Sequence, residues 1–172
     1  MDRKQTTKFL SDLLINVKFS GMGKYWASEV SLDYMMGKGK EKRVDFMQYV
    51  PENQYSIGGL EKGIFICYEV KSCKADVFSG HGLNFEGEKN YLVMTMQTYK
   101  DILNEINTQK IPYYVGILVA CPYFSDLTQE FENPTPLDEE KHWTLKTISA
   151  AHKQARKRSM NELLFCMLRA GH

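Results

Sequence analysis

The spacing of hydrophobic residues changes several times along the chain, and each change predicts a different element. Residues 6–19 place apolar side chains three or four apart with polar residues between them, which predicts an amphipathic helix. Residues 26–36 alternate between apolar and polar side chains, as in a half-buried strand. Residues 43–50 and 64–72 are rich in β-branched and aromatic residues. We therefore expect an opening helix followed by a meander of three strands.

The second half of the chain alternates between strand and helix patterns. Residues 91–96 predict a fourth strand, residues 99–107 a helix, and residues 113–121 a strand that is apolar on both faces. A strand–helix–strand order favours a parallel pair with a right-handed crossover. A short helix is expected around Ala75, and an acidic surface loop over residues 126–140.

Length and composition favour one folded domain. The chain has 172 residues, of which 43% are hydrophobic, so we expect a single α/β domain over residues 1–172. It contains no run of about 18 apolar residues and no export signal, which predicts a cytoplasmic protein without a membrane partner. Its four cysteines form no CxxC pair and are expected to be reduced thiols, mostly buried.

The second and third predicted strands bring three charged side chains together. A hairpin turning at Gly58-Gly59 places Asp45 opposite Glu69. Lys71 lies on the same strand face as Glu69 because it is two residues further along. The third strand is otherwise apolar, so these charged side chains interrupt a core.

Two readings of this charged group stay open from spacing alone. Directly opposed acids repel each other, and a hard divalent cation, Mg²⁺ or Mn²⁺, between Asp45 and Glu69 would offset the repulsion. Lys71 would then orient a water molecule or balance charge on a phosphate. Alternatively, the strand end reaches solvent, and these residues form ordinary surface ion pairs with Arg43.

A basic segment near the end of the chain is a second candidate. Residues 141–158 contain six Lys or Arg residues and no acidic residue, and an apolar helical pattern follows them. The net charge of +1 provides no general attraction for nucleic acid, so any such surface must be local. A helix in this segment could present basic side chains to a phosphate backbone, or be an ordinary solvated face. The basic side chains expected to contact nucleic acid are Lys153, Arg156, Lys157 and Arg158.

The order of elements and the motifs within them resemble the PD-(D/E)XK nuclease superfamily. The segments that carry the resemblance are RVDFMQY, ICYEVKSCKADVFSGHGLNF, NYLVM, IPYYVGILV and RSMNELLFCMLRAG, which span nearly the whole chain. They are similar to small proteins of this class from Gram-positive bacteria and their phages or mobile elements. The resemblance implies a restriction-endonuclease-like αβββαβ core, with a mixed sheet flanked by helices and a basic C-terminal helix.

The resemblance also assigns roles to particular residues. Asp45, Glu69 and Lys71 match the family's metal-dependent catalytic trio. Asp45 and Glu69, with the Val70 carbonyl, would hold Mg²⁺ or Mn²⁺. Val44 stands where the family pattern has proline.

The implied function is a magnesium-dependent nuclease that hydrolyses phosphodiester bonds in DNA. The family often adds an auxiliary glutamate from its first helix, and here Glu29, with Asp33 behind it, is the expected counterpart. One alternative is a non-catalytic protein on a nuclease-like fold that binds nucleic acid or a protein partner through the basic segment. Another is a structural protein of a mobile element.

Overall fold

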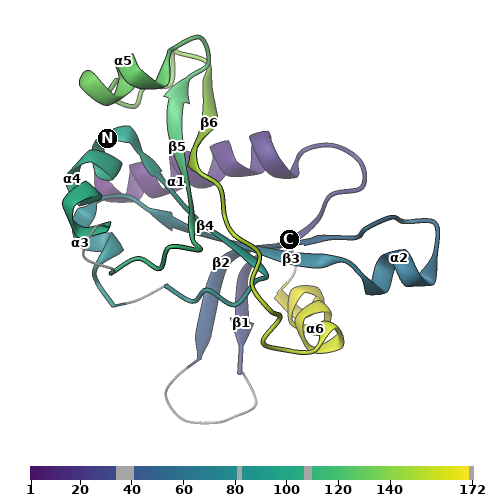
Figure 1. Cartoon of the computed structure of the whole chain (residues 1–172). Helices are drawn as coiled ribbons and strands as arrows, with labels where there is room; N and C mark the ends of the chain where they lie inside the picture. The colour runs from purple at the N-terminus through teal and green to yellow at the C-terminus, as the bar shows by residue number, and fades with distance from the viewer. Residues whose placement is uncertain (34–40, 81–82, 107–109, 171–172) are drawn as a thin grey trace.

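The computed structural model contains a six-stranded mixed sheet with helices on both faces (Figure 1). It describes residues 1–33, 41–80, 83–106 and 110–170. The strands lie in chain order across the sheet, from β1 at one edge to β6 at the other. This arrangement confirms the predicted α/β class with a mixed sheet between helices.

Most element bounds lie close to those predicted. The strands are β1 (Tyr25–Leu32), β2 (Lys42–Val50), β3 (Ile64–Lys71), β4 (Lys89–Thr95), β5 (Gly116–Pro122) and β6 (Trp143–Ser149). The helices are α1 (Arg3–Leu14), the π-helical turn η1 (Ile15–Phe19), α2 (Ile57–Glu61), α3 (Lys74–Val77), α4 (Met96–Ile106), α5 (Leu127–Glu132) and α6 (Met160–Ala170). The predicted ends at Met36 and Asn107 lie outside the described residues.

The sheet combines two pairing patterns. Strands β1, β2 and β3 pair antiparallel, which confirms the predicted meander. Strands β3, β4 and β5 pair parallel, and α4 connects β4 to β5 as expected. Strand β6 returns antiparallel beside β5. The C-terminal ends of the parallel strands β3, β4 and β5 therefore lie along one edge of the sheet.

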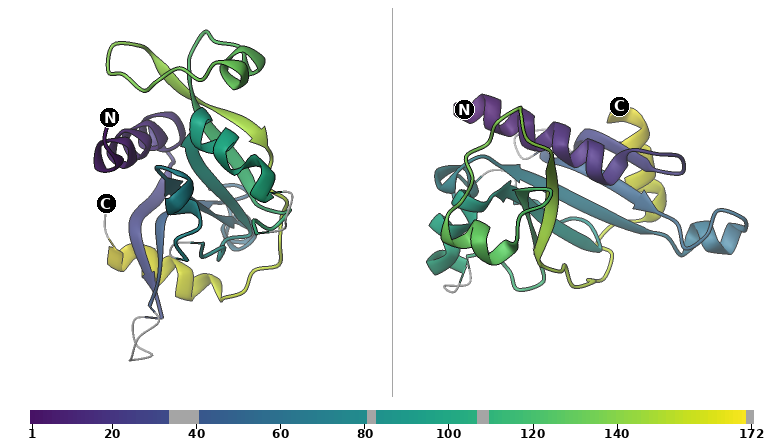
Figure 2. Two further views of the ribbon diagram at one scale, coloured as in Figure 1. Left: turned by 90° about the vertical axis from the view of Figure 1, so that its left-hand side faces the viewer. Right: turned by 90° about the horizontal axis from the view of Figure 1, so that it is seen from above.

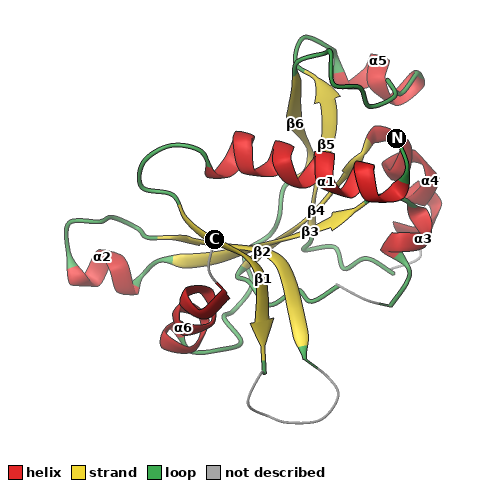
Figure 3. Ribbon diagram, turned by 180° about the vertical axis from the view of Figure 1, so that it is seen from behind, coloured by secondary structure: helices red, strands yellow, loops and turns green. Residues whose placement is uncertain are grey.

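Three groups of buried side chains pack on the two faces of the sheet. On one face, Leu10 and Leu14 of α1 pack against Phe46 and Tyr68 of the strands. On the other face, α6 covers β1–β3, and α4 covers β4 and β5. Figures 2 and 3 show α1 lying across the sheet on the side away from α6.

Local hydrogen bonds determine where α1 begins. Asp2 caps the helix by accepting a hydrogen bond from the Gln5 N–H, and the Gln5 side chain accepts from the Asp2 N–H. The helix continues through η1, and Gly21 follows with a φ of 100°. Glycine occupies such angles without steric cost, so it suits the turn towards β1.

The expected turn at Gly58-Gly59 is instead part of a short helix. Ser56 caps α2 by accepting a hydrogen bond from the Gly59 N–H. A Cβ at Gly59 would lie 2.3 Å from side-chain atoms of Asn53, so a larger residue there would displace the Asn53 side chain. The connection between β2 and β3, which contains α2, extends away from the body of the sheet (Figure 1).

Two predictions for the chain after β5 are wrong in part: the acidic loop over residues 126–140 and the helix in the basic segment 141–158. The acidic loop over residues 126–140 contains α5, which Asp126 caps by accepting a hydrogen bond from the Thr128 N–H. Residues 141–158 contain strand β6 and then a segment without helix, while the C-terminal helix α6 begins only at Met160. Leu145 of β6 is buried in the core opposite Ala120, and this packing favours a strand.

Internal contacts hold two of the basic side chains that were expected to contact nucleic acid. Arg156 donates to a Glu88 carboxylate oxygen from Nη2 and Nε, at 2.8 and 2.9 Å. Lys157 donates to the carbonyl of Phe85. These contacts fasten the segment to the residues before β4.

Arg158 is fastened in the same way. It donates to both carboxylate oxygens of Asp33, at 2.7 and 2.8 Å, and to Glu86 at 3.1 Å. Lys153, by contrast, is exposed. Contact with nucleic acid stays a prediction for these residues, but ion pairing gives Arg156 and Arg158 a structural role.

Candidate functional site

The alternation of side chains between the two faces of the sheet is interrupted once in β1 and once in β2. Ala27 and Val30 are three residues apart but pack in the same core cluster, and so do Val44 and Met47 on β2. Regular alternation would put each pair on opposite faces. The break lies at Glu29, whose φ of 53° is in the left-handed region that non-glycine residues rarely adopt.

The Asp45 carboxylate turns towards β3 at this break. The predicted hairpin register is confirmed as far as Phe46 opposite Tyr68. At Asp45, the side chain accepts a hydrogen bond from the backbone N–H of Val70 at 2.8 Å. Burial raises the pKa of Asp45, although the Val70 N–H and the charge of Lys71 act in the opposite direction.

Glu69 is a deeply buried acid. It is 1% exposed, and neither carboxylate oxygen has a hydrogen-bond partner among the described residues. Burial raises the pKa of Glu69 far above its usual value, and the neighbouring charge of Asp45 raises it further. Lys71 and Arg43 lower it in part. The two acids therefore interact, as the sequence predicts.

Lys71 ends β3 with its side chain buried, at 4% exposure. Its positive charge lowers the pKa values of Asp45, Glu69 and Asp76. The sequence predicts the first two of these neighbours. The ammonium group thus lies within electrostatic reach of three carboxyl groups.

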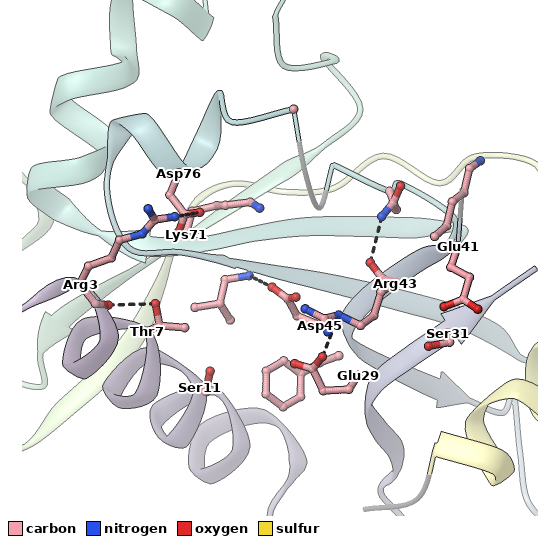
Figure 4. Close-up of a pocket in the computed structure, with 15 residues that line it drawn as sticks. Arg3, Thr7, Ser11, Glu29, Ser31, Glu41, Arg43, Asp45, Lys71 and Asp76 are labelled. Carbon is pink, nitrogen blue, oxygen red and sulfur yellow. Dashed lines mark hydrogen bonds and ion pairs between the residues drawn. The ribbon is translucent and has the colours of Figure 1, made fainter. Parts of the chain in front are cut away.

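A cavity of about 930 Å³ opens beside Asp45 and Lys71 (Figure 4). Strand residues line one side, and Arg3, Thr7 and Ser11 of α1 line another. Glu69 is described by the structure but is not among the lining residues, so it lies beneath the cavity surface. The full lining is Arg3, Thr7, Ser11, Glu29, Ser31, Glu41, Lys42, Arg43, Asp45, Phe46, Val70, Lys71, Asp76, Gly80 and Asn84.

Sequence reasoning missed the contribution of α1 and α3. Arg3, Thr7 and Ser11 are spaced four residues apart, so this polar stripe along the helix was the available signal. Asp76 of α3 accepts hydrogen bonds from the Ser72 N–H and hydroxyl, at 3.0 and 2.9 Å. Burial raises the pKa of Asp76, but these hydrogen bonds and the charge of Lys71 outweigh it and leave the pKa lowered.

Glu29, which the family resemblance implies as the auxiliary acid, lines the cavity. Its carboxylate pairs with the Arg43 guanidinium at 2.8 Å, and both side chains are exposed. Asp33, the second choice, pairs with Arg158 instead. The structure therefore brings Glu29 close to the candidate site but does not assign it a ligand role.

The candidate site offers two carboxylates to a metal ion. Among the described residues, no three His, Cys, Asp or Glu side chains form a metal-binding cluster. Mg²⁺ often uses one or two carboxylates, together with water and substrate phosphates. Asp45 and Glu69 provide the carboxylates, and the unpartnered oxygens of Glu69 lack the bonds that a cation would supply. These residues fit a hard divalent ion, with the Val70 carbonyl as the third expected ligand.

Three of the four cysteines lie in environments that disfavour a reactive thiol. All four are free thiols, and Cys67, Cys121 and Cys166 are buried, as expected. Burial raises the pKa of each of these three thiols, which disfavours the reactive thiolate.

Comparison with known proteins bears on the fold alone. No protein-family model matches the chain, and no curated protein matches it. A solved structure, SPO1766, a protein of unknown function from Silicibacter pomeroyi, matches with a TM-score of 0.51 and 14% sequence identity. The match covers 96% of this chain and 83% of the other. In the part of the chain that the structure describes, no helix is long and apolar enough to cross a membrane.

Proposed function

We propose that this protein is a Mg²⁺- or Mn²⁺-dependent nuclease that hydrolyses phosphodiester bonds in DNA. One observation carries the proposal: the buried Glu69 carboxylate has no hydrogen-bond partner among the described residues and interacts with Asp45 and Lys71 beside an open cavity. Packing gives no reason for such a group, because burying an unpaired carboxyl group destabilises the fold. Perturbed carboxyl groups in a cleft are typical of functional sites.

Each residue has a role in this proposal. Asp45 and Glu69 would hold the cation, and the Val70 N–H fixes the orientation of Asp45. The bound cation would polarise the phosphate and lower the pKa of a coordinated water molecule. Lys71 would stabilise negative charge on the phosphate as the attacking oxygen bonds to phosphorus. Burial of this ammonium strengthens its electrostatic effect because little water screens it.

The substrate and the setting are parts of the same proposal. DNA as substrate and an origin in a phage or mobile element are what the family resemblance implies, and the cytoplasmic location expected from the sequence belongs to the same proposal. The non-catalytic alternative relied on the basic segment. Because Arg156 and Arg158 are committed to internal ion pairs, the structure does not favour that alternative over cleavage.

Two substitutions test the proposal directly. Cleavage of labelled DNA should require Mg²⁺ or Mn²⁺, and Asp45→Asn and Lys71→Met should each lower the rate by about 100-fold or more. Glu52→Gln serves as the control, because Glu52 is an exposed acid away from the cavity lining. Titration calorimetry should detect Mn²⁺ binding to the wild type and not to Asp45→Asn. Equal cleavage rates in the wild type and both site variants would exclude the proposed site.

A further inference from the structure

Two arginines reach the cavity from different elements. Arg3 belongs to the first turn of α1, and Arg43 belongs to β2. Figure 4 shows Arg3 beside Asp76 and Arg43 beside Glu29, with Asp45 between the two pairs. Each arginine side chain is 63% exposed, so a ligand entering the cavity can reach both guanidinium groups.

Arg3 is positioned by an acid that is itself fixed. Its Nη2 lies 2.7 Å from Asp76 Oδ1, while Asp76 Oδ2 accepts the two hydrogen bonds from Ser72. Asp76 therefore keeps its place whether or not Arg3 is paired with it. A guanidinium has five N–H groups, so it can hold this carboxylate at one edge and bind a phosphate at another.

Arg43 is positioned at both backbone and side chain. Its carbonyl accepts a hydrogen bond from the Asn84 side chain at 2.9 Å, and its Nε pairs with Glu29 at 2.8 Å. Its charge also lowers the pKa values of Asp45 and Glu69, which places the guanidinium near the candidate centre. The ion pair with Glu29 is exposed and therefore weak, so a phosphate can replace Glu29 at little cost.

We propose that Arg3 and Arg43 bind backbone phosphates of the substrate strand on the two sides of the phosphate that is cleaved. This inference rests on the proposed function, because it places the cleaved phosphate beside Asp45 and Lys71. Arginine suits the role because it forms charge-assisted, bidentate hydrogen bonds with phosphate oxygens. Such contacts position a strand without reading its sequence.

Salt dependence of binding measures these contacts without cleavage. Fluorescence anisotropy in EDTA would follow a labelled oligothymidylate and, separately, a labelled DNA duplex. Each phosphate contact adds about 0.7 to the slope of log K against log salt for single strands and about 0.9 for duplex. Arg3→Gln and Arg43→Gln should each reduce the slope by that amount, and the double variant by about twice as much. The form of substrate that the cavity holds is the one for which both arginine variants show the full loss expected for that form, about 0.7 for the single strand or about 0.9 for the duplex.

Matched controls separate these contacts from general charge effects. Lys8 lies on the same helix as Arg3, is exposed and pairs with Asp12, while Lys62 is exposed and pairs with Glu52. Lys8→Gln and Lys62→Gln should leave the slope unchanged. Arg3→Lys should keep the slope, because it keeps the charge, and should weaken the affinity, because lysine cannot form the bidentate contact. Unchanged slopes in both arginine variants, or equal losses in the lysine controls, would overturn the inference while metal-dependent cleavage by the wild type still stood. Absence of both DNA binding and cleavage in the wild type would remove the proposed function as well.

Discussion

Two buried glutamates, Glu69 and Glu88, have opposite surroundings in this fold. Glu88 is 4% exposed, and its carboxylate accepts hydrogen bonds from Arg156 and from the Phe65 N–H at 2.7 Å. Glu69 is even more deeply buried and, among the described residues, has no such donor. A paired buried carboxylate is compatible with stability, whereas an unpaired one costs several kcal/mol when it is charged. This contrast is the main support for the role proposed for Glu69.

Replacing Glu69 by glutamine should stabilise the metal-free protein, and increasingly so at higher pH. The folded-state pKa of Glu69 is raised above its unfolded value, so the native state keeps a proton that the unfolded state loses. Stability therefore falls as pH rises above the ordinary pKa of 4.5, and glutamine removes this loss. Urea unfolding in EDTA from about pH 5 to about pH 8 should show a gain that grows to about 1 kcal/mol or more. A gain independent of pH would contradict the assigned protonation.

Glu88→Gln is the matched control for that experiment. It removes a carboxylate of similar burial that is paired with Arg156, so it should destabilise the protein by about 2 kcal/mol or more at neutral pH. Opposite signs for the two substitutions would establish that the difference lies in their partners rather than in burial.

At the scale of elements, the candidate site depends on the break shared by β1 and β2. The alternation shifts in both strands, at Glu29 in β1 and between Val44 and Met47 in β2, and at this shift Asp45 accepts the hydrogen bond from the Val70 N–H. Backbone strain of this kind is commonly found at functional sites. The strained residue here lines the same cavity as Asp45 and Lys71.

Glu29→Gly should therefore stabilise the fold. Glycine adopts a φ of 53° without the steric cost that a side chain imposes, so we expect a gain of about 0.5–1 kcal/mol in thermal or urea unfolding. The lost ion pair with Arg43 is exposed and offsets little of this. Ser28→Gly, one residue earlier on the same strand, should instead destabilise by a similar amount. Destabilisation by both changes would argue against strain at Glu29.

The sequence predicts the meander and its register because local patterns determine both. Alternation and β-branched residues define β2 and β3, and their register places Phe46 opposite Tyr68 as observed. It does not predict β6, because Trp143–Ser149 is a half-buried edge strand whose pairing with β5 is a tertiary contact. The shift at Glu29 is equally invisible, since a positive φ in a non-glycine residue has no sequence signal of its own.

At the scale of the whole molecule, the basic segment before α6 stabilises the tertiary structure through ion pairs and hydrogen bonds. Arg156 contacts Glu88 and the Gly63 carbonyl, and Arg158 links Asp33 to Glu86. These contacts join parts of the chain that are far apart in sequence. The sequence predicts a helix here from the apolar helical pattern that follows the segment. It does not reveal the observed conformation, because the partners of these arginines lie in distant segments.

Arg156→Met should destabilise the protein by about 3 kcal/mol, because it leaves the Glu88 carboxylate buried with less compensation. Lys157→Met, at the exposed neighbouring position, should cost less than about 1 kcal/mol. A double-mutant cycle with Glu88→Gln would measure the coupling by chemical unfolding. Additive effects of Arg156→Met and Glu88→Gln would show that the pair is not coupled.

The packing of α6 against β1 also has a consequence for biosynthesis. Leu163, Cys166 and Met167 cover Ala27 and Val30, so α6 completes the core around β1 although it follows every other described element along the chain. A nascent chain leaves this apolar surface exposed on the ribosome until α6 has been translated. Such surfaces favour aggregation, so newly made chains should bind a chaperone until α6 emerges.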